Sequence, residues 1–282
     1  MILIADSGST KTDWRIIDRS IVVSATQTLG FNPYYQDSDS IAAELQANLL
    51  PHCKGKITQV FYYGTGITNA EKAEVLRTAI LKVFSEIAHI DVQSDVLGAA
   101  RAACGHQAGI GCILGTGSNS CYFDGEKIAF QVPPLGFWLG DEGSGGHLGK
   151  LLLLAYLHKE MPANIRLLFE EKYGVMDRLM VLDNAYHKPF PNRYFASYAR
   201  FIHENIHDTF CYGLATQSFS LFFEKYILKY PMCFDVKLNF VGSIGFYYKQ
   251  ILAEVAENKK LSIGNILASP IDGLVKYHTE TI

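Results

Sequence analysis

The sequence lacks the features that mark several classes of protein. Its 25 lysines and arginines form no long basic run and are outnumbered by 28 acidic residues, so binding to nucleic acid through phosphate neutralisation is not expected. The longest apolar run, at 151–157, is too short to span a bilayer. The apolar start stops at Asp6, too early to form a signal-peptide core. We therefore expect a cytoplasmic protein without nucleic-acid or membrane partners.

Cysteine pairs are missing as well. The six cysteines stand apart in the chain with no Cys-x-x-Cys motif, a distribution typical of reduced thiols in a cytoplasmic protein. What the sequence has in quantity is apolar side chains, since 49% of its 282 residues are hydrophobic and 19% are charged. This composition predicts a folded protein with a substantial core in one or two domains.

Strand-like and helix-like patterns alternate through the first third of the chain. The patterns predict strands at 2–5, 13–17, 21–26, 60–63 and 90–92, and helices at 40–50, 70–84 and 96–104. A second series of strands is predicted at 111–114, 120–123 and 127–131. Helices dominate after residue 143, with one more strand at 237–241, a single helix after it to about residue 257, and a last helix from residue 271.

The two series of strands begin alike. ILIADSGSTKTDWRIID and GCILGTGSNSCYFDG both read as an apolar strand, a turn of small residues and a second strand. We interpret this as the duplication of one βββαβα unit. The predicted fold class is α/β, with an N-terminal domain at 1–107, onto which 270–282 packs back, and a C-terminal domain at 108–269 that carries a helical insertion.

The turn at 6–13, DSGSTKTD, is suited to binding a phosphate. A tight turn exposes backbone N–H groups, and small residues such as Gly8 let a phosphate approach them. Asp6, at the end of the first strand, is placed to hold Mg²⁺ through water. The side chains that add hydroxyl or ammonium donors are Ser9, Thr10, Lys11 and Thr12. An ordinary hairpin favours the same residues, so both interpretations stay open at this point.

Two further turns extend this chemistry. The turn Gly115-Thr116-Gly117-Ser118-Asn119 occupies the equivalent place in the second series of strands. Later, Gly242-Ser243-Ile244-Gly245 leads from a strand into a helix, and its glycines let an adenine or ribose lie against the backbone. Two phosphate-binding turns at matching places indicate a nucleotide held between the two halves.

In their order and spacing, the three turns resemble the phosphate 1, phosphate 2 and adenosine motifs of the actin/hexokinase/Hsp70 ATPase fold. The segment at 136–144, GFWLGDEGS, is similar to the GDEGS segment of the BadF/BadG/BcrA/BcrD ATPase family, in the branch of the N-acetylglucosamine kinases. The resemblance covers essentially the whole chain. It implies two ribonuclease-H-like domains with an ATP cleft between them, ATP and Mg²⁺ as cofactors, and phosphoryl transfer to the 6-hydroxyl of N-acetylglucosamine or a related amino sugar.

The resemblance also implies roles for individual residues. Asp95, which opens the last helix of the first domain, matches the catalytic base, and the helix N-terminus should keep it ionised. Asn32, Asn119 and Asp141 match sugar-binding positions. The positions that match ATP contacts are Asp6, Gly8, Ser9, Thr10, Lys11, Gly115, Thr116, Gly117, Ser118, Gly242, Ser243 and Gly245. From the residues alone, Ser94-Asp95 also reads as a helix cap.

Other functions stay open beside the kinase. Members of the same family are activases, ATPases that carry a [4Fe–4S] cluster between two subunits, and such a cluster needs closely set thiolates. A nucleotide-binding protein without sugar kinase activity is a third interpretation. The sequence does not decide which sugar is the acceptor or whether the chain forms a homodimer.

Overall fold

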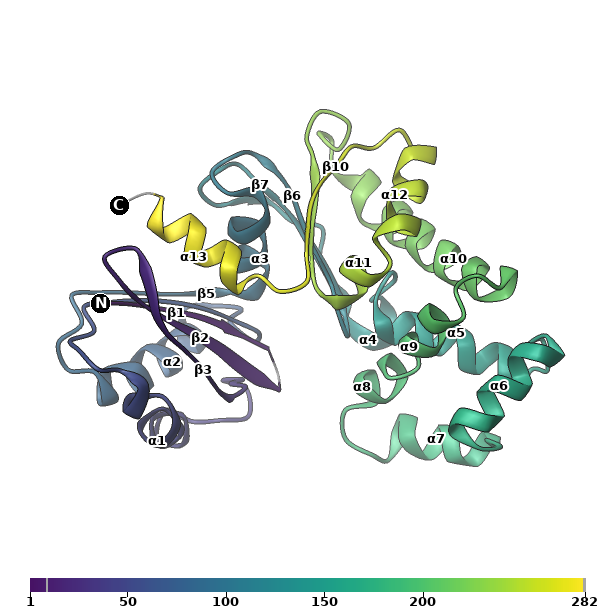
Figure 1. Cartoon of the computed structure of the whole chain (residues 1–282), viewed down its shortest axis with the longest axis horizontal. Coiled ribbons are helices and arrows are strands. Elements are labelled where there is room, and N and C mark those ends of the chain that lie inside the picture. The colour runs from purple at the N-terminus through teal and green to yellow at the C-terminus, as the bar shows by residue number, and fades with distance from the viewer. Residues whose placement is uncertain (9, 281–282) are drawn as a thin grey trace. The chain divides into compact units, whose positions relative to one another are not determined.

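The computed structural model describes residues 1–8 and 10–280 and contains two compact units (Figure 1). Unit 1 comprises Met1–Gln107, Phe123–Lys127 and the segment from Ser269 on, and unit 2 comprises Ala108–Tyr122 and Ile128–Ala268. Ser9, predicted to contact ATP, lies outside the described residues. Each unit contains a mixed five-stranded sheet packed against helices, which confirms the predicted α/β class.

The sheet of unit 1 has the strand order β3-β2-β1-β4-β5. Its strands are β1 (Ile2–Ser7), β2 (Lys11–Asp18), β3 (Ile21–Leu29), β4 (Gln59–Gly64) and β5 (His89–Ser94). The first three strands are antiparallel, and β4 and β5 run parallel to β1. The register pairs Ser7 with Gly64 and Gly64 with Ser94, so the carboxyl ends of the three parallel strands form one edge, the usual place for a ligand in such sheets.

Helices cover both faces of this sheet. On one face the core contains Leu3, Trp14 and the buried residues of the helices α1 (Ser38–Asn48) and α2 (Ala70–Val83). On the other face lie α3 (Asp95–Cys104) and the C-terminal α13 (Ile271–Thr279), which pack side by side (Figure 1). The alternation of side chains along β1 explains this division, because Leu3 faces the first core and Ile4 the second.

A buried polar network attaches α13 to the sheet. Arg101 donates to the hydroxyl of Tyr63 (2.7 Å) and to the carboxylate of Asp91 (3.2 Å), and the same hydroxyl lies 2.8 Å from Nε2 of His278. Burial, together with the nearby charge of Arg101, lowers the pKa of His278 from 6.5 to about 4. His278 is therefore neutral in the native state at pH 7.

This network predicts a loss of stability in mild acid. The unfolded chain binds a proton at His278 near pH 6.5 and the folded chain only near pH 4, so stability falls as the pH falls between these values, on the order of 3 kcal/mol in all. In His278→Gln, which keeps an acceptor for Tyr63 but does not titrate, this part of the loss should disappear. Urea unfolding at pH 7 and pH 5 measures it. Equal pH dependence of the two proteins would contradict the prediction.

The sheet of unit 2 repeats the topology of unit 1. Its order is β10-β9-β6-β7-β8, which is the order of unit 1 when β6 is matched to β1 and each later strand to its successor. The strands are β6 (Gly109–Leu114), β7 (Ser118–Phe123), β8 (Ile128–Phe130), β9 (Leu238–Val241) and β10 (Ile263–Leu267). The common order confirms the predicted duplication, although β10 itself was not predicted.

Helices make up the rest of unit 2. They are α4 (Gly136–Leu139), α5 (Gly145–Leu157), α6 (Ala163–Tyr173), α7 (Arg178–Tyr186), α8 (Pro191–Ala196), α9 (Ala199–Glu204), α10 (Thr209–Lys225), the 3₁₀ helix η2 (Ile227–Lys229), α11 (Ser243–Tyr247) and α12 (Lys249–Asn258). The single helix predicted after β9 is therefore two helices. Most of the aromatic side chains of α9 and α10 lie in one core with Leu114 and Phe240.

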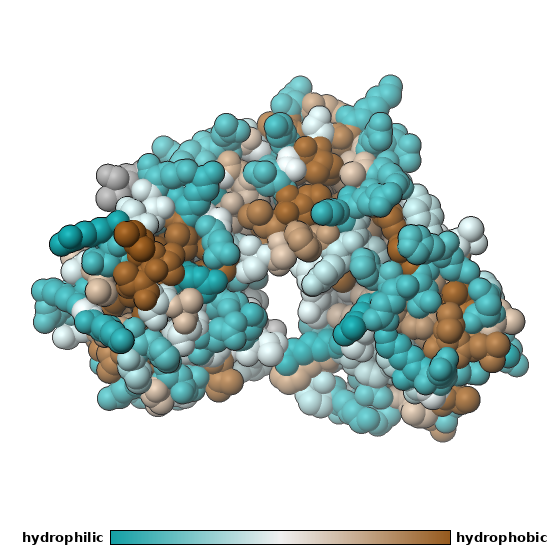
Figure 2. Space-filling model, in the orientation of Figure 1, coloured by the Kyte–Doolittle hydropathy of each residue, from teal (hydrophilic) through white to brown (hydrophobic). Residues whose placement is uncertain are grey.

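Hydrophilic side chains cover most of the face that Figure 2 shows. Figure 2 shows apolar side chains gathered in separate patches on both units, among larger hydrophilic areas. Of the helices in the part of the chain that the structure describes, none is long and apolar enough to cross a membrane.

Candidate functional site

The turn between β1 and β2 has the geometry of a tight hairpin. The N–H of Gly8 donates to the carbonyl oxygen of Lys11 (3.0 Å), and the register places Asp6 directly opposite Asp13. Lys11 forms an ion pair with Asp13 (2.9 Å), which also accepts a hydrogen bond from Gln27 (2.6 Å). The ammonium group of Lys11, predicted to meet a phosphate, is thus held beside a carboxylate at the base of the turn.

Thr12 does not have the predicted role of phosphate donor. Its side chain is buried, and its hydroxyl donates to the carbonyl oxygen of Leu29 (3.0 Å) while accepting from Ser7 (2.7 Å). Ser7 in turn accepts the N–H of Phe31 (3.3 Å). Because each hydroxyl proton already has an acceptor, these two residues fasten the hairpin to the loop after β3.

Two half-buried carboxyl groups, those of Asp6 and Asp95, lie at the edge formed by the ends of β1, β4 and β5. Burial raises the pKa of Asp6 to about 7, with a further contribution from the charges of Asp13 and Asp95 and an opposing one from Lys11. Burial also raises the pKa of Asp95, although its own N–H and that of Val96 oppose the shift. The N–H groups at the start of the helix thus lower the pKa of Asp95, as expected, but burial has the larger effect in the opposite direction.

The structure separates Asp95 from the helix cap. Ser94 is the N-cap of α3, and its hydroxyl accepts the N–H of Leu97 (3.4 Å). Asp95 is the first residue of the helix and lies half-buried at the sheet edge. The capping role thus belongs to Ser94, whose side chain and not that of Asp95 accepts the N–H of Leu97.

The donor set around Asp6 fits a magnesium ion. Carboxylate oxygens are the ligands that Mg²⁺ prefers, and two aspartates facing each other across β1 and β2 are stabilised by a cation. Among residues 1–8 and 10–280, no group of three or more His, Cys, Asp or Glu side chains is arranged to hold a metal ion.

Asn32 lies in the loop after β3. Its side-chain oxygen accepts the N–H of Tyr34 (3.0 Å), and its own N–H donates to Gln36 (2.8 Å). A Cβ atom on Gly66, just beyond β4, would approach this oxygen to 2.7 Å. The sugar-binding position predicted from the resemblance is thus held rigidly, beside the loop that follows β4.

In unit 2, the turn between β6 and β7 lies against the start of α5. The N–H of Gly145 donates to the carbonyl oxygen of Gly115 (2.8 Å), and the N–H of Gly146 donates to that of Thr116 (3.0 Å). The N–H of Gly115 itself donates to Gly117 (3.0 Å). The GDEGS segment and the second phosphate motif therefore form one structure, although 20 or more residues separate them in the sequence.

Asp141 and Ser118 are in direct contact. The N–H of Ser118 donates to Oδ1 of Asp141 (3.1 Å), and a Cβ atom on Gly117 would lie 2.9 Å from Oδ2. Burial raises the pKa of Asp141, which the N–H of Ser118 and the charge of Lys150 oppose. The hydroxyl of Ser118 is buried and has no hydrogen-bond partner among the described residues, an arrangement that a bound ligand would complete.

The remaining predicted residues of unit 2 have structural contacts. Oδ1 of Asn119 accepts hydrogen bonds from the N–H of Ser120 (2.8 Å) and from Gln131 (3.0 Å). Gly242 has φ of 119° and its N–H donates to Leu267 (2.9 Å), while a Cβ atom there would overlap the carbonyl oxygen of Leu114. Ser243 begins α11, and a Cβ atom on Gly245 would meet Phe240 and Leu114 at 3.4 to 3.9 Å.

Sequence reasoning missed residues of α5 and α10 that contact the GDEGS segment. The hydroxyl of Ser218 accepts the N–H of Gly143 and lies beside the ring of His147. The hydroxyl of Tyr226 donates to Glu142. Burial, followed by the charge of Lys150, lowers the pKa of His147 to about 4. Only Tyr226 carried a signal in the sequence, because it lies on one helical face with other aromatic residues, a pattern that is typical of a core position.

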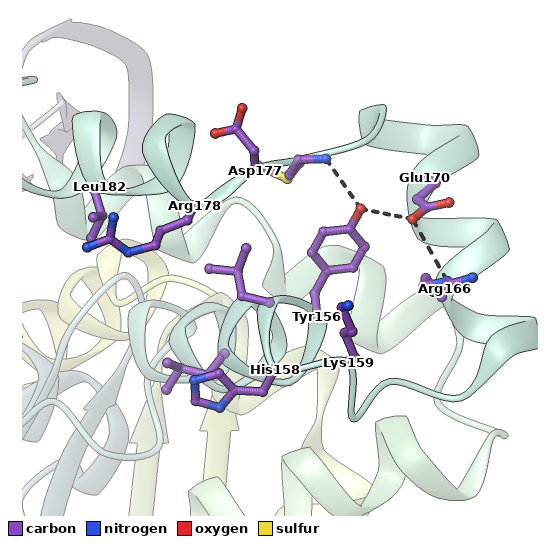
Figure 3. A pocket seen from close by; sticks show the side chains of 11 residues that line it. Tyr156, His158, Lys159, Arg166, Glu170, Asp177, Arg178 and Leu182 are labelled. Atoms are coloured by element: carbon purple, nitrogen blue, oxygen red, sulfur yellow. Dashed lines mark hydrogen bonds and ion pairs between the residues drawn. The ribbon is translucent and has the colours of Figure 1, made fainter.

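A cavity of about 580 Å³ lies elsewhere in unit 2, at the C-terminal end of α5 (Figure 3). Its lining includes Tyr156, whose hydroxyl donates to Glu170 (2.9 Å) and accepts the N–H of Met176 (3.3 Å). None of the predicted site residues lines this cavity. The predicted residues lie instead in two groups, one at the carboxyl edge of each sheet.

Two units of the same topology, each with a glycine-rich turn after its first strand, define the class of two-domain actin-like ATPases and sugar kinases. No protein-family model matches the sequence, and no curated protein matches it. Among solved structures, a candidate N-acetylglucosamine kinase from Chromobacterium violaceum matches with a TM-score of 0.73 and 16% identity, over 98% of either chain. A ROK family glucokinase from Streptomyces griseus, in complex with glucose and AMPPNP, matches with a TM-score of 0.55 and 15% identity, over 98% of this chain and 97% of its own. At these identities the likeness shows the fold alone.

A third structure is much more similar. A candidate N-acetylglucosamine kinase from Porphyromonas gingivalis has 42% identity and a TM-score of 0.93, over 99% of either chain. The chain belongs to the N-acetylglucosamine kinase-like branch of the BadF/BadG/BcrA/BcrD ATPase family, within the actin/hexokinase/Hsp70 superfamily. The resemblance found in the sequence is thereby confirmed.

Proposed function

We propose that this protein transfers the γ-phosphoryl group of ATP to the 6-hydroxyl of N-acetylglucosamine or a related amino sugar. The observation that carries the proposal is the 42% identity, over 99% of the chain, to a candidate N-acetylglucosamine kinase. The geometry of the site supports it, because carboxyl groups whose pKa is raised by burial and glycine-rich turns occur at the carboxyl edges of both sheets.

Asp95 is proposed as the general base. A sugar hydroxyl is a poor nucleophile at neutral pH, and a positioned carboxylate both orients the hydroxyl and takes its proton as the new bond forms. Because burial raises its pKa, the carboxylate of Asp95 is a stronger base than an exposed one. Exclusion of water from the site would favour transfer to the sugar over hydrolysis of ATP.

The other predicted residues are proposed to bind and orient the substrates. Asn32, Asn119 and Asp141 would bind the sugar, with the carboxylate of Asp141 accepting hydroxyl hydrogen bonds. Mg²⁺, held through water by Asp6, would neutralise charge on the phosphates of ATP. The proposed contacts with ATP are Gly8, Ser9, Thr10, Lys11, Gly115, Thr116, Gly117, Ser118, Gly242, Ser243 and Gly245. The buried, unpaired hydroxyl of Ser118 supports this assignment.

The assembly and setting of the enzyme are also proposals. We propose that residues 1–107 with 270–282, and residues 108–269, are its two ribonuclease-H-like domains, and that it acts in the cytoplasm. Light scattering on the purified chain decides between a monomer and a homodimer.

A coupled assay of ADP release over amino sugars and plain hexoses tests the proposed function. We expect N-acetylglucosamine or a close relative to show the highest kcat/KM and to yield a 6-phosphate. If the protein binds ATP but no sugar increases the formation of ADP, the chain is a nucleotide-binding protein and the kinase proposal is wrong.

Iron analysis of the same preparation tests the activase alternative. Four of the six cysteines are buried, and burial raises the pKa of Cys211 to about 12, so its thiol stays protonated at neutral pH. We expect a colourless protein without iron or sulfide. A brown protein that contains both would favour the activase.

A further inference from the structure

Three polar side chains, on α10 and on the residues that follow it as far as Tyr230, contact the loops around Asp141. Ser218, Tyr226 and Tyr230 are eight and four residues apart, a spacing that repeats on one side of a helix. All three side chains are buried in the core of unit 2. Each hydroxyl contacts a segment of the chain that borders the Ser118–Asp141 pair.

Ser218 holds the end of the GDEGS segment. Its hydroxyl accepts the N–H of Gly143 (3.2 Å) and lies 2.8 Å from Nδ1 of His147. Because burial lowers the pKa of His147 to about 4, its ring is neutral at pH 7 and Nδ1 can accept a hydrogen bond from this hydroxyl. The intervening turn of α10 places Phe222 against Gly143, where an added Cβ atom would approach the Phe222 side chain to 2.8 Å.

Tyr226 holds the middle of the same segment. Its hydroxyl donates to Oε2 of Glu142 (3.1 Å), and the backbone N–H of Asp141 interacts with the same hydroxyl. Gly140 makes this approach possible, because a Cβ atom there would lie 2.5 Å from the Tyr226 hydroxyl. Tyr230 supports the neighbouring strand through Ser120 (2.9 Å) and the N–H of Val132 (3.2 Å).

These contacts surround a residue in an unfavourable conformation. Asp141 has φ of 62°, in the left-handed region, which costs a residue other than glycine on the order of 1 kcal/mol or more. Such a conformation persists only where its surroundings enforce it. Here Tyr226 contacts the residue before Asp141, the N–H of Asp141 and the residue after it. Ser218 binds the N–H of the next residue, Gly143.

We infer that Tyr226, assisted by Ser218, is a positioning residue that holds Asp141 in its left-handed conformation and so fixes the carboxylate against Ser118. The kinetic consequence rests on the proposed function, in which Asp141 binds the sugar. Displacing a positioning group by about 1 Å can cost a rate factor of about 100, so a loosened Asp141 would lower kcat as well as weaken sugar binding.

The test compares Tyr226→Phe with Tyr248→Phe. Both variants keep the ring and remove one buried hydroxyl from the same core, but the hydroxyl of Tyr248 donates to the carbonyl oxygen of Ala199 (2.6 Å) and not to any of residues 140–147. Hydrogen exchange read by mass spectrometry should show the amides of 140–147 exchanging about tenfold faster in Tyr226→Phe, and unchanged in Tyr248→Phe. In the kinase assay, Tyr226→Phe should lower kcat about tenfold and raise the KM for sugar, with the KM for ATP unchanged.

The exchange readout does not depend on the kinase proposal. Equal exchange at 140–147 in both variants would overturn the inference. Faster exchange in Tyr226→Phe, together with unaltered sugar kinetics, would also overturn it, because the role would then be only structural. If the unaltered protein has no kinase activity, the proposed function fails, and faster exchange still supports the positioning of Asp141. Ser218→Ala replaces Tyr226→Phe in the same comparison if that variant does not fold.

Discussion

Asp95→Asn should lower kcat at least about 100-fold while sugar binding changes little. The asparagine keeps the size of the side chain but cannot accept the proton of the attacking hydroxyl. Because burial raises the pKa of Asp95, its ionised form is unfavourable in the folded protein, so the neutral asparagine should leave thermal stability at pH 7 unchanged or raise it. Steady-state kinetics, sugar binding by calorimetry and thermal unfolding measure the three quantities.

Ser94→Ala is the matched control for Asp95→Asn. It removes the N-cap of α3 and should cost about 1 kcal/mol of stability with little change in kcat. The pair separates the capping role from the catalytic one. If Asp95→Asn lost stability and kept its kcat, the assignment of Asp95 would be wrong, and the base would be sought at Asp141.

Gly242→Ala should destabilise the protein by at least about 3 kcal/mol and prevent a meaningful measurement of ATP binding. The φ of 119° is strained for alanine, and the added Cβ atom would overlap the carbonyl oxygen of Leu114, a backbone atom in β6 that cannot easily move. Urea unfolding measures the loss. Stability equal to that of the unaltered protein would contradict this account of Gly242.

Gly245→Ala is the better test of the proposed adenosine contact. A Cβ atom there would make ordinary contacts of 3.4 to 3.9 Å, so the variant should fold. If Gly245 borders adenosine, the KM for ATP should rise several-fold, with the KM for sugar unchanged. An unchanged KM for ATP in the folded variant would assign this turn to packing alone.

The strands and glycine-rich turns could be predicted because they depend on neighbouring residues. β1 and β6 are continuous apolar runs that end in turns of small residues, and this short-range pattern is enough to place them. The repetition of the pattern also predicted the common strand order of the two sheets. The resemblance to a family rests on the same short segments.

β10 could not be predicted, because its own residues do not favour a strand. Gly264 and Asn265 interrupt its apolar pattern, and both residue types are depleted in strands. The strand forms because β9 offers a parallel partner, and because the side chain of Asn239 accepts the N–H of Asn265 (2.9 Å). Pairing with a strand more than 20 residues earlier in the chain therefore stabilises β10, although its own residues do not favour a strand.

The sequence by itself determined the fold class, the duplication and the family, and it led to the residues that we propose act on ATP and a sugar. The tertiary structure alone decided how those residues are used. Thr12 has a hydroxyl like its neighbours, but folding buries this hydroxyl, which donates a hydrogen bond to the carbonyl oxygen of Leu29. Asp95 begins a helix, yet burial raises its pKa against the N–H groups there. Asp141 meets Ser118 through contacts from α10, 77 residues or more along the chain from Asp141. Burial and long-range contacts arise only when distant segments pack, so no local pattern contains them.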